Sequence, residues 1–202
     1  MTPRPRASRP ADNPFTSRRI DQLGFRFRGN DIDEILAVLA GQDHRGVIVG
    51  PHGSGKTTLL EHLADHLTGR IVWVRLNAES GRPFSTAKKH IRSRPGPEHT
   101  ILIDGAEQLS PWSWWRIHRH IRHAGAIVIT SHQPGRLPTL HECATDPELL
   151  TELVEELAPD TAGSMDLDAV FQRNHGNIRL CFRELYDRWA GIGAGRDGVP
   201  EP

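Results

Sequence analysis

The amino-acid sequence predicts a three-layer α/β fold with a mostly parallel sheet, followed by a small C-terminal helical cap. Three observations support this prediction. Short apolar runs alternate with helical patterns up to about residue 144, which is typical of a parallel sheet covered on both faces. Beyond that point no strand pattern appears, and three helical patterns follow in succession. A glycine-rich turn also joins the first apolar run to a helix, in GVIVGPHGSGKTTLLEHL at 46–63.

The chain has 202 residues, a length that suits one α/β domain with a small appendage. Its Pro-, Arg- and Ser-rich beginning predicts a disordered tail over 1–14. We expect the α/β core to occupy 15–144 and the helical cap, or lid, to occupy 145–190. The remaining segment, 191–202, is expected to be flexible.

Five apolar runs are the predicted strands of the sheet. They lie at 46–49, 71–76, 100–104, 126–130 and, as a short fifth strand, 139–143. Helical spacing of apolar residues predicts the segments between and after them. These helical segments lie at 31–40, 57–67, 84–93, 110–123, 146–157, 166–175 and 177–189.

Capping residues mark where several of these helices begin. Asp31 is followed three residues later by Glu34, the spacing of a capping box. Ser110 precedes Pro111, which suits an N-cap followed by the first helical position. Asp146 and Asp166 are further expected caps.

The composition limits the classes of partner and compartment. The formal net charge is zero, so the chain is not a polyanion binder by total charge alone. Its first 30 residues nevertheless contain seven arginines, which suit nucleic acid, an acidic partner or simply a solvated tail. Only two isolated cysteines are present, a pattern that indicates no disulfide framework and predicts a location in the reducing cytoplasm. No apolar run approaches the ~20 residues that span a bilayer, so we expect no membrane partner.

The glycine-rich turn predicts a site for a nucleoside triphosphate. Residues 50–57, GPHGSGKT, fit the pattern G-x-x-x-x-G-K-[ST] without a gap. Glycines let several backbone N–H groups point at one anion, and the following helix adds its positive end. Lys56 would supply a charge to the outer phosphates, and the Thr57 hydroxyl suits Mg²⁺. The candidate nucleotide-binding residues are Gly50, Pro51, His52, Gly53, Ser54, Gly55, Lys56, Thr57 and Thr58.

A second acid is needed beside such a loop to hold Mg²⁺. Asp104 closes the apolar run TILID, at the carboxyl end of a predicted strand, where open α/β sheets bind ligands. We therefore predict that Thr57 and Asp104 are the metal-side residues and that the cofactors are ATP and Mg²⁺. The alternative is that Asp104 only begins a turn before Gly105.

These motifs resemble the Walker A and Walker B motifs of P-loop ATPases that have an extra strand between the two motif strands. Within that class the chain is most similar to the AAA+ and STAND group. FRGNDIDEILAVL resembles the segment that precedes the loop, and ITSH at 129–132 resembles sensor 1. GNIR at 176–179 is similar to the Gly-x-x-Arg of sensor 2. The resemblance spans roughly 25–190.

The resemblance also implies the catalytic residues, with one departure from the pattern. Such ATPases place a glutamate directly after the Walker B aspartate, where this chain has Gly105. Glu107 is the candidate to orient the attacking water instead, if the chain curls into a helix, although it could equally cap the following helix. Arg179 would contact the γ-phosphate when the cap closes, or would be an ordinary exposed arginine. Arg136 is a candidate finger supplied to a neighbouring copy.

The sequence favours an ATP-binding switch, and with it ATP hydrolysis, coupled to a protein partner or to nucleic acid. A small P-loop kinase acting on a nucleotide or metabolite is the alternative. A GTPase is disfavoured because no N-K-x-D or T-K-x-D motif is present. The partner, the rate of hydrolysis and the oligomeric state are not determined by the sequence.

The segment 110–123 offers a further candidate surface. Trp112, Trp114 and Trp115 fall within one helical turn, and three such side chains cannot all face a core. One of them is therefore a candidate for contact with a partner, whereas core packing is the ordinary role. The run HRHIRH at 118–123 suits either nucleic-acid phosphates or the solvated face of a packed helix.

Overall fold

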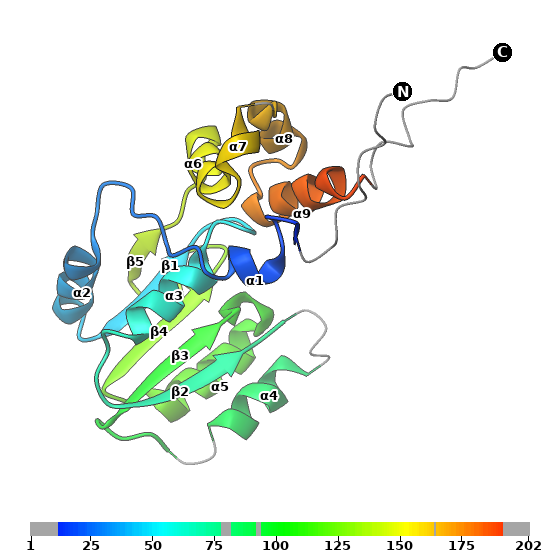
Figure 1. Cartoon of the computed structure of the whole chain (residues 1–202). Coiled ribbons are helices and arrows are strands. Elements are labelled where there is room, and N and C mark those ends of the chain that lie inside the picture. Colours follow the sequence, from blue (N-terminus) through cyan, green and yellow to red (C-terminus); the bar gives the residue numbers. More distant parts are fainter. Residues whose placement is uncertain (1–11, 78–81, 92–93, 164, 192–202) are drawn as a thin grey trace, which may run out of the picture. The chain divides into compact units, whose positions relative to one another are not determined.

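The computed structural model describes residues 12–77, 82–91, 94–163 and 165–191 (Figure 1). Its backbone divides into two compact units. One unit comprises 25–144, and the other combines 1–24 with 145–202. We call them the α/β unit and the helical unit.

The α/β unit confirms the predicted fold class. Its five strands form one sheet with the order β2-β3-β4-β1-β5, and every pair of neighbours is parallel. The elements of this unit are α2 (Ile32–Gly41), β1 (Arg45–Val49), α3 (Lys56–Ala64), β2 (Arg70–Arg75), α4 (Pro83–His90), β3 (His99–Asp104), the 3₁₀ helix η2 (Ala106–Gln108), α5 (Pro111–Ile121), β4 (Ala126–Ser131) and β5 (Thr139–Glu142).

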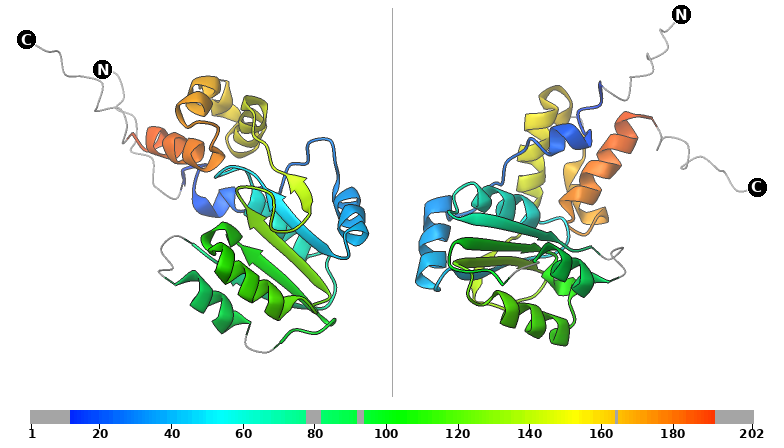
Figure 2. Two further views of the ribbon diagram at one scale, coloured as in Figure 1. Left: turned by 180° about the vertical axis from the view of Figure 1, so that it is seen from behind. Right: turned by 90° about the horizontal axis from the view of Figure 1, so that it is seen from below.

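Helices cover both faces of the sheet, as Figure 2 shows. Successive side chains of a strand point to opposite faces of the sheet, so one strand contributes to two apolar clusters. On β3, Ile101 and Ile103 join the apolar cluster that includes α5, whereas Leu102 joins the cluster that includes α2 and α3. All three side chains are fully buried. The apolar run of β3 is therefore continuous because both of its faces are covered.

The strand order determines which loops meet at the candidate site. β4 lies between β1, which precedes the loop at 50–57, and β3, which ends at Asp104. The extra strand expected between the strands of the two Walker-like motifs is therefore present. Val49, near the end of β1, is in register with Ser131 of β4, and Ile103 of β3 is in register with Ile129. Because the strands are parallel, the chain segments that follow β1, β3 and β4 emerge at the same edge of the sheet.

The helical unit contains the three helices predicted after residue 145. They are α6 (Pro147–Leu157), α8 (Leu167–Arg173) and α9 (Ile178–Trp189), and two short helices that the sequence did not predict, α1 (Ser17–Ile20) and α7 (Pro159–Ala162), accompany them. The expected cap Asp146 accepts a hydrogen bond from the Leu149 N–H over 2.6 Å. Aspartate or asparagine also caps α8 and α9.

The described residues 12–24 belong to the helical unit, whereas the expected core of 15–144 included 15–24. Phe15 is 2% exposed within the apolar cluster of α6, α8 and α9, and its ring stacks on that of Phe182 with centroids 6.3 Å apart. The Asn13 side-chain amide donates to the Tyr186 carbonyl over 3.0 Å. A single aromatic residue without periodic neighbours gives no pattern from which such docking could be predicted. The predictions for 1–11 and 192–202 lie outside the described residues.

Candidate nucleotide-binding site

The loop between β1 and α3 has the backbone that its glycines predicted. Gly50, Gly53 and Gly55 have φ values of 154°, 73° and 87°, a region that favours glycine. A Cβ atom at Gly50 would lie 2.6 Å from the Cys143 carbonyl oxygen, so a side chain would not fit there. Gly55 is the N-cap of α3, so the loop ends at the positive end of a helix, the location that favours phosphate.

Lys56 is the first residue of α3, and its side chain reaches back over this loop. Its Nζ donates to the Gly50 carbonyl over 2.8 Å and to the Pro51 carbonyl over 2.6 Å. Ser54 Oγ donates to the same Pro51 carbonyl over 3.0 Å. The ammonium group therefore lies against the mouth of the loop, in position to exchange carbonyl partners for phosphate oxygens.

Thr57 and Asp104, the predicted metal-side residues, are in direct contact. Thr57 Oγ1 lies 3.0 Å from Asp104 Oδ2 and 3.2 Å from Oδ1. The contact joins the first turn of α3 to the carboxyl end of β3. A hydroxyl and a carboxylate are the oxygen ligands that Mg²⁺ prefers in proteins.

Thr130 holds the Asp104 carboxylate in place from the neighbouring strand. Its Oγ1 donates to Asp104 Oδ1 over 2.7 Å and accepts from the Gly105 N–H over 2.8 Å. Thr130 is 1% exposed, so its hydroxyl is buried with both hydrogen-bonding roles satisfied. The sequence placed Thr130 at the correct strand end, but the order of the strands was needed to pair it with Asp104.

Glu107 lies close to the end of β4, because the chain turns into a short helix after β3. It is the middle residue of η2, and its Oε1 is 3.5 Å from His132 Nε2. Its other oxygen, Oε2, is buried and has no hydrogen-bond partner among the described residues. A buried carboxylate oxygen without a partner is costly, which makes it a good acceptor for a water molecule.

Two histidines bring the loop and the end of β4 together. The rings of His52 and His132 meet edge to face, with centroids 3.9 Å apart. Burial lowers the pKa of His132, which Glu107 raises and His52 and Lys56 lower further. Since burial is the largest of these effects, the neutral imidazole is favoured in the folded protein.

The lowered pKa of His132 predicts a loss of stability in acid. The unfolded chain, with an ordinary histidine pKa near 6.5, binds the proton more readily, so the free energy of unfolding should fall as the pH drops below about 6.5. His132→Gln should reduce this fall, measured as the difference between urea unfolding at pH 7.5 and at pH 5.5. The exposed His66, replaced by glutamine, is the matched control. An identical pH dependence in wild type and His132→Gln would contradict the prediction.

Arg136 packs within its own chain rather than pointing outward as a finger. Its Nη2 donates to the Leu109 carbonyl over 2.5 Å, and its guanidinium lies over the Trp114 ring at 5.4 Å. Burial lowers its pKa, and the nearby Glu107 raises it. These contacts argue against a role for Arg136 as a finger supplied to a neighbouring copy.

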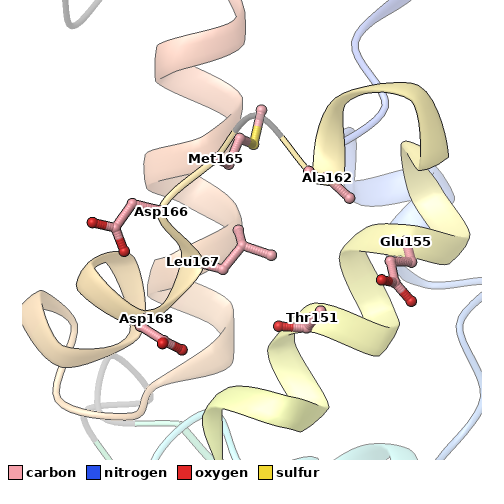
Figure 3. A pocket seen from close by; sticks show the side chains of 8 residues that line it. Thr151, Glu155, Ala162, Met165, Asp166, Leu167 and Asp168 are labelled. Carbon is pink, nitrogen blue, oxygen red and sulfur yellow. The ribbon is translucent and has the colours of Figure 1, made fainter.

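Arg179 lies in the helical unit, in the first turn of α9, where it is exposed. A pocket of about 270 Å³ opens elsewhere in this unit (Figure 3). Its lining includes the carboxylates of Glu155, Asp166 and Asp168, which would repel a triphosphate. Among the described residues, no group of three or more His, Cys, Asp or Glu side chains could hold a metal ion. None of the helices in the described ranges is long and apolar enough to span a membrane.

Comparisons with known proteins give a limited similarity. No protein-family model matches the chain. The aerobic cobaltochelatase subunit CobS from a Sinorhizobium species is 32% identical over 108 residues, which cover 52% of this chain and 30% of that protein. The chain thus matches about a third of the length of this curated relative. A solved structure of Drosophila ORC bound to DNA aligns with a TM-score of 0.38 and 14% identity, over 78% of this chain and 52% of that one.

Proposed function

We propose that the loop at 50–57 binds ATP with Mg²⁺ and that the protein is an ATPase switch of the AAA+/STAND type. One observation carries this proposal: the loop, Lys56 and the Thr57–Asp104–Thr130 network lie together at the carboxyl edge of the sheet. A magnesium-bound triphosphate needs N–H and ammonium donors for its phosphates and oxygen ligands for its metal ion. Few other ligands need both.

Each residue has a proposed role in this function. The loop amides and Lys56 would bind the phosphates, while Thr57 and Asp104 would hold Mg²⁺. The metal ion would neutralise charge on the phosphate oxygens. Glu107 would orient the attacking water through the carboxylate oxygen that has no partner among the described residues. Arg179, exposed on α9, would stabilise the charge on the γ-phosphate in the nucleotide-bound protein.

Two findings support the AAA+ type and the coupling to a partner. The sheet order, with β4 between β1 and β3, is the arrangement that the resemblance implied. The sequence similarity to CobS supports a general ATP-binding function of this type. That relative is by name a subunit of a larger enzyme, which supports a protein partner for this chain. We also propose that the protein acts in the cytoplasm.

A small P-loop kinase is the alternative, because the same loop and metal-side residues serve phosphate transfer to an acceptor. The two functions differ in what they consume. A switch releases phosphate from ATP in buffer alone, whereas a kinase consumes ATP only when an acceptor is added. Phosphate release without any acceptor would therefore favour the switch.

Glu107→Gln tests the proposed hydrolysis. If Glu107 orients the water, the substitution should reduce the rate of phosphate release by about 100-fold or more, the usual contribution of a catalytic base. ATP binding should persist, because the glutamine has the same size and lies outside the loop. The measurement is phosphate release under single-turnover conditions, alongside calorimetric titration with ATP.

The matched control is Glu98→Gln, which removes a carboxylate whose side chain is 65% exposed. The control should hydrolyse ATP like the wild type. An unchanged rate in Glu107→Gln would remove Glu107 from the mechanism and leave ATP binding intact as a proposal.

A further inference from the structure

The outward face of α5 exposes two of its three tryptophans. Trp112 is 66% exposed and Trp115 is 49% exposed, whereas Trp114 packs against the apolar cluster beneath the helix. The exposed rings stack on each other, with centroids 5.0 Å apart and planes 18° from parallel. Large aromatic side chains exposed together are unusual on a protein surface and mark binding sites.

A guanidinium group extends this stack along the helix. Arg119 lies over the Trp115 ring at 5.9 Å, so Trp112, Trp115 and Arg119 form one row at helical spacing. Arg116 lies over the ring of Phe84 on the neighbouring helix α4, at 4.8 Å. Arg116 and Arg119 are thus both held against aromatic rings.

The surroundings of this row are basic. Neither 82–97 nor 108–141 contains a single Asp or Glu in the sequence. The helices α4 and α5, which lie in these segments, contact each other and pack against the same apolar cluster of the sheet. The exposed cationic side chains of α4, α5 and the C-cap of α5 are Lys88, Lys89, Arg116, Arg119 and Arg122. A chain with zero net charge therefore carries two adjacent helices whose charged side chains are all positive, which is complementary to a polyanion.

We propose that this face, formed by Trp112, Trp115 and the five cations of α4 and α5, binds single-stranded nucleic acid. Unpaired bases offer flat faces that stack on exposed indole rings, and the phosphates between them match a basic surface. A duplex hides its base faces within its own stack. An acidic polypeptide would satisfy the cations but has no series of flat rings for the tryptophans. This inference does not depend on ATP binding at the loop.

The test measures binding of the full-length chain to a fluorescently labelled, single-stranded 20-mer of thymidine by anisotropy. The double variant Trp112→Ala/Trp115→Ala should bind at least about tenfold more weakly, because each stacked base contributes substantially. The matched control is Leu180→Ala, another large apolar side chain exposed on a helix, and it should bind like the wild type. Circular dichroism verifies that all the variants are folded.

A second pair of variants tests the cations. Arg119→Gln/Arg122→Gln should lower the slope of log affinity against log salt by about 1.4, since each phosphate contact on a single strand contributes roughly 0.7. The control, Arg18→Gln/Arg19→Gln, removes two exposed arginines on α1 and should leave the slope unchanged. Arginines before residue 12 are present in every variant and so contribute an equal background.

The proposal is overturned by any of three results. The first is equal binding of the oligonucleotide by the tryptophan variant and the wild type, which would assign binding to other basic residues. The second is no binding to the single strand, and the third is tighter binding to the duplex or to poly-glutamate with the same tryptophan dependence. The last result would assign the face to a duplex or an acidic protein instead.

Discussion

Lys56→Ala is expected to weaken ATP binding by at least about 100-fold, which corresponds to about 3 kcal/mol. The reason is the position of Nζ, 2.8 Å from the Gly50 carbonyl and 2.6 Å from the Pro51 carbonyl. In that position the ammonium group faces whatever anion the loop holds, and its charge-assisted bonds to phosphate would all be lost. Calorimetric titration with ATP, with and without Mg²⁺, measures the effect.

Two controls accompany this measurement. Lys88→Ala removes an exposed lysine of α4 and should leave ATP affinity unchanged. Thermal unfolding without nucleotide shows how much the lost bonds to the loop carbonyls matter to the fold itself. If Lys56→Ala binds ATP as tightly as the wild type, the loop is not the phosphate site and the proposed function fails.

Asp104→Asn should remove most of the effect of Mg²⁺ while keeping the shape of the site. The oxygen of asparagine can still accept from Thr130 Oγ1, which lies 2.7 Å from Asp104 Oδ1, and its amide nitrogen can donate to Thr57 Oγ1, which lies 3.0 Å from Oδ2. Asparagine lacks the negative charge that holds a divalent cation. We expect phosphate release to fall by about 100-fold or more, because the metal contributes several kcal/mol to the transition state. Affinity for ATP without Mg²⁺ should change little or rise.

The matched control for this charge is Asp65→Asn, at the C-cap of α3, where the carboxylate is exposed. The Mg²⁺ concentration required for half-maximal phosphate release separates the two variants. If Asp104→Asn has the same Mg²⁺ requirement as the wild type, then Asp104 is not a metal-side residue and its contact with Thr57 is structural only.

The sequence predicted the elements of the α/β unit well because their signals are local. Apolar runs such as TILID predicted β3, which ends at Asp104 as expected. Asp31 and Ser110, the expected caps of α2 and α5, each accept a hydrogen bond from a backbone N–H three residues later. Such signals depend only on neighbours within one turn or one strand. The same locality explains why the loop at 50–57 can be recognised from its residues alone.

The sequence did less well where a residue acts through distant partners. Nothing near Phe15 in the sequence indicates that it packs on Phe182, and the predicted start of the core was therefore placed too early. Arg136 looked available as a finger, but its partners Leu109 and Trp114 lie more than 20 residues away along the chain. The contact of Glu107 with His132 likewise crosses from η2 to the end of β4.

By itself, the sequence determined the fold class and the positions of the glycine-rich loop at 50–57 and of the acid at the end of β3. Their signals are the spacing of glycine, lysine and apolar residues along short segments of the chain. Only the tertiary structure decided that Thr130 orients Asp104 and that two tryptophans of α5 face outward on a basic surface. The physical reason is the sheet order, which brings β4 beside β3, together with the packing of α5, which buries one side of the helix and exposes the other.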